Sequence, residues 1–87
     1  MSDRTIGILG LGIFGSSVLT ALAKQDMNII AIDDHAERIN QFEPVLARGV
    51  VGDITDEELL RTAGIDTCDT VVVATGENLE SVSYTHL

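Results

Sequence analysis

Apolar residues in this chain gather in four short runs, and the segments between the runs mix apolar with polar positions. Each run is rich in residues that favour β-strands. Strands that are apolar at nearly every position are typical of parallel sheets, in which both faces of the strand are buried. We therefore predict four parallel strands, at Thr5 to Leu9, Asn28 to Ile32, Gly49 to Gly52 and Thr70 to Ala74.

The segments between the runs predict helices. The first helix begins near Ile13, because mainly apolar residues follow at near-helical spacing, at Phe14, Val18, Leu22 and Gln25. The second helix covers about Ala36 to Phe42, and Pro44 then marks a break.

The third predicted helix follows the third strand. Thr55 or Asp56 can cap it, and Gly64 is a good C-terminal stop. The resulting order β-α-β-α-β-α-β, with short connections and right-handed crossovers, predicts an α/β fold. It is a Rossmann-type doubly wound parallel sheet with strand order 3-2-1-4.

A glycine motif joins the first predicted strand to the first helix. Gly10, Gly12 and Gly15 have the spacing G-x-G-x-x-G, and the strand–turn–helix context makes the motif far more specific than the glycines alone. Gly10 permits the tight turn, Gly12 lets a pyrophosphate approach the backbone, and Gly15 lets the helix pack closely on the sheet. The helix start at Ile13 and Phe14 points free N–H groups at the phosphates. The motif therefore predicts an adenine-nucleotide site.

Acidic residues extend the predicted site. Asp33 ends the second strand about 20 residues after the glycines. There a carboxylate can accept both ribose hydroxyls, and its charge repels a 2′-phosphate, so NAD(H), ADP or ATP is favoured over NADP. The alternative is an exposed helix cap. Asp34 either belongs to the site or caps the next helix. Asp53 either accepts a bond from the adenine amino group, with Ile54 beside the ring, or is a plain turn aspartate.

The remaining predicted site residues end the fourth strand. Ligands of open α/β sheets bind where the strand order reverses, so the backbone of Ala74, Thr75 and Gly76 should line the second half of the ligand. We see no nucleophile beside a base and no metal-ligand spacing, and we predict neither a catalytic residue nor a metal site. His35 is expected in a solvated loop and Arg38 on the surface.

The end of the chain departs from the predicted fold. A Rossmann-type half-domain should continue into another helix and strand, whereas the sequence ends at residue 87. Val82–Leu87 reads like the translated end of a transposon adapter used in sequencing libraries. We therefore expect residues 1–81 to be the N-terminal part of a nucleotide-binding domain and residues 82–87 to be a non-native tail. The fourth strand would then have a bare edge.

Composition narrows the class of protein. The 87 residues include only five Lys or Arg, and the formal net charge is −9. This composition provides no basic surface for the phosphate backbone of a nucleic acid. The single cysteine, Cys68, permits no internal disulfide and fits a reducing compartment. No apolar run is long enough to cross a bilayer, and Asp3 and Arg4 lead straight into the first strand instead of a signal peptide. We expect a cytoplasmic protein.

Four segments together resemble the N-terminal (RCK/TrkA-N) domain of the cytosolic regulatory subunits of Trk/Ktr-type potassium uptake. They are Gly10–Val18, Ala31–Asp33, Val51–Thr55 and Val72–Asn78. The resemblance covers essentially residues 4–81, and the G-D-x-T segment is not a general dehydrogenase feature. It implies a non-enzymatic gating subunit that binds NAD(H), ADP or ATP. Such subunits assemble into homo-oligomeric rings under a membrane-embedded potassium-translocating subunit, and so lie in the cytoplasm at the inner membrane.

The resemblance also assigns residues by position. The three glycines match the phosphate loop, Asp33 matches the ribose-binding acid, and Asp53 with Ile54 and Thr55 matches the adenine-side segment. Many relatives carry arginine where this chain has Ile13, so a charge contact from that position to a β- or γ-phosphate is absent here.

Other functions are compatible with the same motif. The alternative from another class is the cofactor-binding half of an NAD-dependent oxidoreductase, and a third is a nucleotide-binding fold with a purely structural role. A catalytic domain with a placed Lys, His or Tyr would favour the oxidoreductase. A second small ligand-binding domain would favour the regulator.

Overall fold

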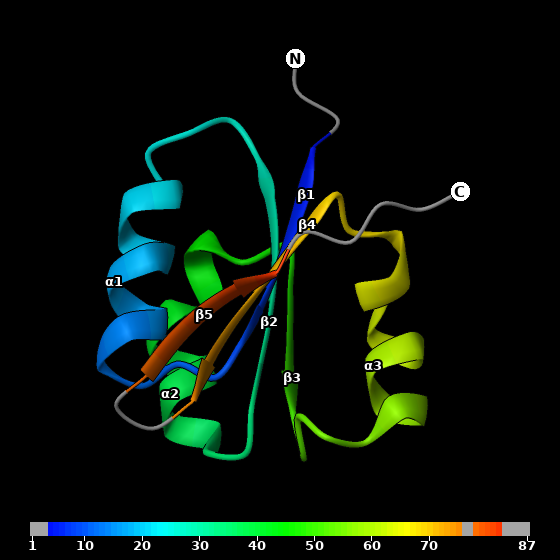
Figure 1. The fold of residues 1–87 in the computed structure, drawn as a ribbon. Helices are drawn as coiled ribbons and strands as arrows, with labels where there is room; N and C mark the ends of the chain where they lie inside the picture. The colour runs from blue at the N-terminus through cyan, green and yellow to red at the C-terminus, as the bar shows by residue number, and fades with distance from the viewer. Residues whose placement is uncertain (1–3, 76–77, 83–87) are drawn as a thin grey trace.

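The computed structural model of the chain describes residues 4–75 and 78–82. It contains one sheet of five strands in the order β3-β2-β1-β4-β5 (Figure 1). Four of them run parallel, namely β1 (Thr5–Leu9), β2 (Asn28–Asp33), β3 (Arg48–Val51) and β4 (Thr70–Thr75). The last, β5 (Asn78–Val82), is antiparallel to β4. The predicted Rossmann-type α/β class and the order 3-2-1-4 of the parallel strands are confirmed.

Helices cover both faces of the sheet (Figure 1). The helices α1 (Ile13–Leu22) and α2 (Ala36–Phe42) lie on one face, and α3 (Glu57–Ala63) lies on the other. Because the crossovers are right-handed, the reversal of strand order after β3 places α3 on the opposite face. Two short 3₁₀ turns, Glu43–Val45 and Ile65–Thr67, follow α2 and α3.

Two apolar clusters, one on each face, hold the helices to the sheet. The cluster beneath α1 and α2 consists of Ile6, Ile8, Leu11, Leu19, Ile29, Ala31 and Ile39. The cluster beneath α3 consists of Leu9, Ile30, Ile32, Ala63, Ile65, Cys68 and Val71. Burial, together with nearby Asp69 and Asp66, raises the pKa of Cys68 to about 11, so this cysteine is a packed, neutral thiol.

The helix ends follow the local sequence. Asp56 caps α3 by accepting the N–H groups of Glu58 and Leu59, and Gly64 ends the helix in the left-handed conformation with φ of 94°. The bounds of α2 are those predicted, and Pro44 lies in the 3₁₀ turn that follows it. Of the two predicted cap residues, Thr55 and Asp56, it is Asp56 that caps α3.

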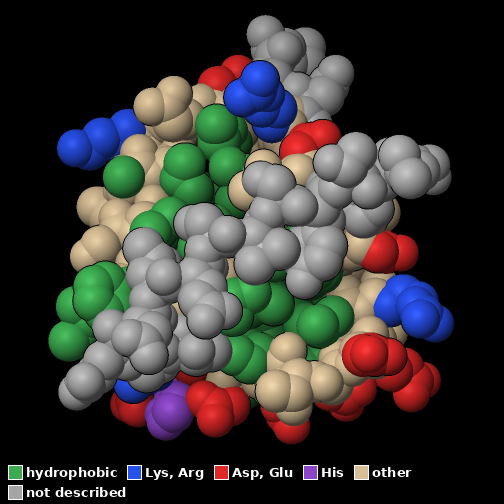
Figure 2. All heavy atoms as spheres, viewed as in Figure 1, with side chains coloured by type: hydrophobic (Ala, Val, Ile, Leu, Met, Phe, Trp, Pro, Cys, Tyr) green, Lys and Arg blue, Asp and Glu red, His purple; other side chains and the backbone are tan. Residues whose placement is uncertain are grey.

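Parallel pairing brings the carboxyl ends of the strands to one edge of the sheet. Ile8 of β1 pairs with Ala31 of β2 and with Val72 of β4, and Asp33 pairs with Val51 of β3. The loops that follow β1, β2 and β3 therefore emerge together, at the lower end of Figure 1. Acidic side chains gather along this edge in Figure 2.

The fourth strand does not have the bare edge that the sequence predicted. β4 pairs with β5 in an antiparallel register, in which Val73 lies opposite Glu80 and Ala74 opposite Leu79. The physical reason is that β5 satisfies the backbone N–H and C=O groups that an unpaired edge would expose. Val82 belongs to this strand, whereas residues 83–87 lie outside the described residues, and the domain boundary at residue 81 stays a prediction.

Among the described residues, no helix has the length and apolar character needed to span a membrane.

Candidate functional site

The carboxyl edge of the sheet holds a cavity of about 380 Å³, which we call the edge cavity. Its walls come from the glycine loop after β1 and from the chain at the ends of β2, β3 and β4. The residues that line it are Gly10, Gly12, Ile13, Asp33, Asp34, Arg38, Asp53, Ile54 and Ala74. The volume lies within the range of small-molecule sites, which begins near about 300 Å³. The tertiary structure thus brings most of the predicted site residues to one cavity.

Of the other predicted site residues, Phe14 and Gly15 are not among the described residues that line the edge cavity. Gly15 is buried within α1, against the glycine loop. Phe14, also on α1, is 39% exposed. Thr75 ends β4, where the backbone is described, and Gly76 lies outside the described residues.

Two glycines of the loop are required by the fold itself. Gly10 has φ of 98°, a conformation that L side chains rarely adopt, and a Cβ there would collide with the carbonyl oxygen of Ala74. A Cβ on Gly15 would collide with the carbonyl oxygen of Gly10. The tight turn predicted at Gly10 and the close packing predicted at Gly15 are confirmed.

Gly12 differs from these two glycines. Its φ of −72° and ψ of −157° are open to any residue, and a Cβ there would meet no atom within 4 Å. Neither backbone strain nor packing within the described residues therefore requires a glycine at this position. Gly12 lines the edge cavity.

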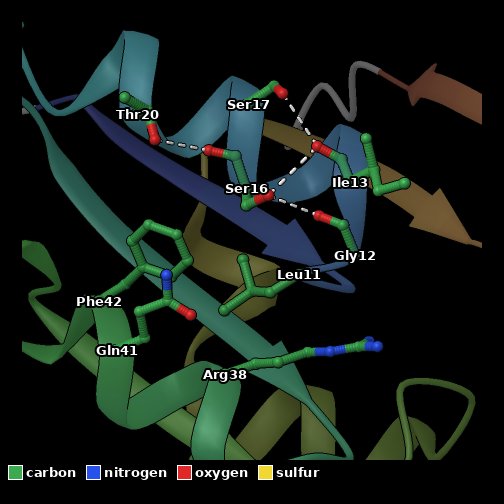
Figure 3. A pocket seen from close by; sticks show the side chains of 9 residues that line it. All are labelled: Leu11, Gly12, Ile13, Ser16, Ser17, Thr20, Arg38, Gln41 and Phe42. Atoms are coloured by element: carbon green, nitrogen blue, oxygen red, sulfur yellow. Dashed lines mark hydrogen bonds between the residues drawn. The ribbon is translucent and has the colours of Figure 1, made fainter.

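The first turn of α1 beside Gly12 is open. The N-cap residue, Gly12, has no side chain that could accept the first N–H groups of the helix, and the first turn contains no acidic residue. The Ser16 hydroxyl donates to the Gly12 carbonyl at 2.7 Å, and the Ser17 hydroxyl donates to the Ile13 carbonyl at 2.9 Å (Figure 3). These hydroxyls turn toward carbonyls and away from the first N–H groups of the helix, which have no intrahelical acceptor. The positive end of the helix dipole therefore faces the loop without a neutralising side chain.

Asp33 is buried at the end of β2, with 2% of its surface exposed. Its Oδ2 accepts the N–H of Leu11 in the glycine loop at 2.6 Å, and its Oδ1 accepts the N–H of His35 at 2.8 Å. The Nη1 of Arg38 lies 3.5 Å from Oδ2. The carboxylate therefore ties the glycine loop to β2 and to the start of α2. The interpretation of Asp33 as an exposed cap is wrong, because the residue is buried and the N-cap residue of α2 is His35.

The charge state of Asp33 follows from these contacts. Burial alone would raise its pKa, but hydrogen bonds from Leu11 and His35 and the positive charge of Arg38 outweigh burial and lower the pKa below 3.8. Asp33 is therefore ionised at neutral pH, and as a carboxylate it can only accept hydrogen bonds.

Asp34 does not cap α2, and that interpretation is wrong. The N-cap residue is His35, whose backbone N–H is already taken by Asp33. The Oδ1 of Asp34 instead lies 2.6 Å from Nδ1 of His35, and Nδ1 is also 3.1 Å from Oδ1 of Asp33. The His35 ring is half-exposed between two carboxylates, and His35 lies in the exposed loop before α2, as the sequence predicted.

The same residues offer one ligand-type atom each within 4.8 Å of one another. Both oxygens of Asp33 already accept backbone N–H groups, and Asp34 and His35 are exposed. We assign no metal to this group.

Asp53 is exposed in the loop after β3. Its Oδ1 accepts the hydroxyl of Thr55 at 2.7 Å and the N–H of Thr55 at 2.8 Å, and these bonds lower its pKa. Asp53 therefore has the contacts of a turn aspartate, one of its two predicted roles. Both bonds use Oδ1, and the residue lines the edge cavity beside half-buried Ile54.

Arg38 is a site-lining residue that the sequence analysis placed on the surface. It lies in the first turn of α2, and its side chain is 43% exposed beside Asp33. It lines the edge cavity together with Gly12 and Ile13. An arginine in the first turn of the helix that follows the acidic residue was the available signal, because α2 begins three residues after Asp33.

A second cavity, of about 710 Å³, lies between α1 and α2 and is called the helix cavity here (Figure 3). Its lining residues are Leu11, Gly12, Ile13, Ser16, Ser17, Thr20, Arg38, Gln41 and Phe42. Gly12, Ile13 and Arg38 line both cavities. In Figure 3 the Arg38 side chain extends from α2 past Leu11 along the helix cavity. The two cavities therefore meet at the glycine loop.

The fold and the glycine loop define the class of this chain as a Rossmann-type α/β domain with a cavity at the carboxyl edge of its parallel strands. The TrkA-N domain family matches residues 6–87. Because that match covers most of the chain, the chain belongs to the TrkA-N domain family. The resemblance found in the sequence is confirmed.

Three relatives are potassium uptake proteins of the Ktr system. The chain is 33% identical over 84 residues to Ktr system potassium uptake protein C of Bacillus subtilis, covering 97% of this chain and 38% of that protein. It is 28% identical to protein A of the same organism, covering 100% and 39%, and 25% identical to protein A of Vibrio alginolyticus, covering 91% and 36%. The chain spans less than two fifths of the length of these relatives.

Proposed function

We propose that this chain is the nucleotide-binding part of a regulatory subunit of a potassium uptake system, and that it binds an adenine nucleotide, NAD(H) or ADP/ATP, at the glycine loop. Membership of the TrkA-N domain family and the Ktr system relatives support the link to potassium uptake. The same relatives favour a regulator over the cofactor half of an oxidoreductase, and we propose no catalytic activity.

The observation that carries the proposal is the open space at Gly12. Gly10 and Gly15 are explained by contacts within the fold, whereas a Cβ at Gly12 would meet no atom within 4 Å. A ligand that approaches the backbone closely is the physical reason for a glycine there. The uncapped first turn of α1 lies at the same place, and helix starts of this kind bind phosphate groups.

The remaining residues of the edge cavity suggest how the ligand lies. With the diphosphate against the N–H groups that follow Gly12, the ribose would reach Asp33 and the adenine would reach Asp53 and Ile54. The ionised Asp33 would accept ribose hydroxyls and would oppose a 2′-phosphate, which disfavours NADP. Ala74, with Thr75 and Gly76 after it, would approach the second half of the ligand.

Regulation would then follow from differential binding. Ligands that fill the edge cavity differently would stabilise different positions of the glycine loop and α1, and can shift this equilibrium only by their difference in affinity for the two states. We propose that a homo-oligomeric ring conveys the shift to a membrane-embedded potassium-translocating subunit, from the cytoplasmic side of the inner membrane.

A titration of NAD, NADH, ADP, ATP and NADP against the purified chain tests the proposal. We expect saturable binding of at least one of the first four ligands and weaker binding of NADP. Gly12→Val should reduce the affinity at least a hundredfold, because its side chain fills the space of the phosphates, and should leave the circular dichroism spectrum unchanged. Thr20→Val, an exposed β-branched change on the same helix, is the control. Normal binding by the Gly12 variant would remove the phosphate assignment.

A further inference from the structure

Arg38 has an unusual place at the junction of the two cavities. Its guanidinium and the Leu11 N–H both contact Oδ2 of Asp33, at 3.5 Å and 2.6 Å. Arg38 also lines the edge cavity and the helix cavity, together with Gly12 and Ile13. The guanidinium therefore lies beside the glycine loop, although α2 follows a different strand.

The charges around the edge cavity are unbalanced. Asp33, Asp34 and Asp53 line it, and Arg38 is its one cation among the described lining residues. The first turn of α1 adds no charged side chain, because Ile13 stands there with 81% of its surface exposed. A polyphosphate entering this cavity would therefore meet three carboxylates, and Arg38 is the group placed to offset their repulsion.

The acceptor sites of Asp33 are nearly all in use. Oδ1 accepts the His35 N–H and lies beside the His35 ring, and Oδ2 accepts the Leu11 N–H and lies beside Arg38. A carboxylate offers about four lone-pair positions, so a ribose hydroxyl binds most readily where a present contact gives way. The Arg38 contact is the longest of the four and belongs to a half-exposed side chain, so it is the one that a ligand displaces most easily.

We propose that Arg38 is a phosphate-binding residue that exchanges partners when a nucleotide enters. In this structure it pairs with Asp33. When a nucleotide binds, it moves to the 5′-phosphates at the glycine loop, and Oδ2 of Asp33 becomes available to the ribose. This inference rests on the proposed nucleotide site and names the residue that recognises its charge. Because of this exchange, Arg38 strengthens the binding of the 5′-phosphates and opposes the binding of the ribose.

The 5′-phosphates are favoured over a 2′-phosphate for a geometric reason. Arg38, Gly12 and Ile13 line both cavities. Gly12 and Ile13 belong to the loop where the diphosphate is proposed to lie. A 2′-phosphate would lie at the ribose, next to the ionised and buried carboxylate of Asp33. ADP carries only 5′-phosphates and 2′-AMP carries only a 2′-phosphate, so these two ligands distinguish the two positions.

The test compares adenosine, ADP and 2′-AMP on the 87-residue chain and on Arg38→Met. Arg61→Met is the matched control, because it removes the same charge from exposed Arg61 on α3, which lines neither cavity. For Arg38→Met we expect ADP affinity to fall about tenfold to a hundredfold, the range for a lost charged hydrogen bond. Adenosine affinity should stay the same or rise, and Arg38→Lys should recover part of the ADP affinity. Circular dichroism checks that each variant is folded.

The other outcomes are equally decisive. If the wild-type chain binds neither adenosine nor ADP, the proposed function fails, and this inference fails with it. If the wild-type chain binds both and Arg38→Met lowers both equally, or neither, the function stands and the exchange is overturned. A loss confined to 2′-AMP would place the guanidinium at the ribose and overturn the assignment to the 5′-phosphates.

Discussion

The helices α1 and α3 both begin at the carboxyl edge of the sheet, but they treat their first N–H groups differently. At α3, Oδ1 of Asp56 accepts the N–H groups of Glu58 at 3.1 Å and Leu59 at 3.3 Å, and the first turn contains two glutamates. At α1 the N-cap residue is Gly12, no side chain caps the helix, and the first turn holds no acid.

This difference separates a helix start that stabilises itself from one that is open to a ligand. The carboxylates around α3 neutralise its positive end, so this end would not stabilise a bound anion. At α1 the fold holds the loop in place through Gly10, Gly15 and Asp33, and leaves the space at Gly12 empty. The loop is thus supported by contacts on one side and open on the other. Substitutions at Asp33, Asp56 and Ile13 would alter this contrast.

The largest effect is expected from Asp33→Asn, which weakens the anchor of the α1 loop. Replacing the charged acceptor of the buried Leu11 N–H should lower the free energy of unfolding by about 1–3 kcal/mol at neutral pH, and should weaken adenosine binding by a similar amount. Urea unfolding and calorimetry measure the two effects. Asp34→Asn, an exposed neighbour, should change the free energy of unfolding far less.

The Asp33 effect should depend on pH in one direction. Its folded pKa lies below 3.8, so its stabilisation is complete above about pH 4 and is lost as the pH falls through the lowered value. The difference in unfolding free energy between the wild-type chain and Asp33→Asn should therefore shrink on acidification. A difference that stays constant down to about pH 2 would show that the charge of Asp33 does not support the loop.

Asp56→Ala removes the cap that distinguishes α3 from α1. We expect a loss of about 1 kcal/mol in the free energy of unfolding, because two N–H groups lose their acceptor. Nucleotide affinity should not change, since Asp56 does not line the edge cavity. Asp56→Asn keeps an acceptor oxygen and should retain most of the stability. A drop in ADP affinity with Asp56→Ala would mean that the two helix starts are coupled.

The smallest effect on stability is expected from Ile13→Glu, which gives α1 an acidic first turn like that of α3. The new charge should stabilise the helix by about 0.3–1 kcal/mol through the helix dipole, while it weakens ADP binding by repelling the phosphates. Opposite signs for thermal stability and ADP affinity are the expected result. Ile13→Gln is the uncharged control, and equal ADP affinities for the two variants would place the phosphates away from the start of α1.

Much of the fold could be predicted because its signals are local. The continuous apolar runs identified the parallel strands, Gly64 marked the end of α3, and the glycine spacing located the turn into α1. The right-handed crossover rule then ordered the strands without any knowledge of their contacts. The edge of β4 was predicted wrongly, because the pairing of Asn78–Val82 depends on which backbone groups are left unpaired once the other strands have assembled.

The candidate site was likewise predicted only in part. The sequence located the glycine loop and the acid at the end of β2, but not the orientation of that acid or the position of Arg38. Asp33 was expected to face a ligand, whereas it also holds Leu11, 22 residues away, and pairs with Arg38. The interpretation of Asp34 as a cap failed because α2 begins at Ala36, which makes His35 the N-cap residue.

Residue order alone was sufficient for the strand–loop–helix unit and for the family, because backbone preferences and hydrophobic periodicity act over a few neighbouring residues. Assembly of the sheet was needed to show that Gly12 faces empty space, that Asp33 is already bonded, and that Arg38 reaches the glycine loop. These facts depend on which side chains the packed helices bring together across strands. Such contacts are set by the geometry of the whole sheet, and no stretch of neighbouring residues contains them.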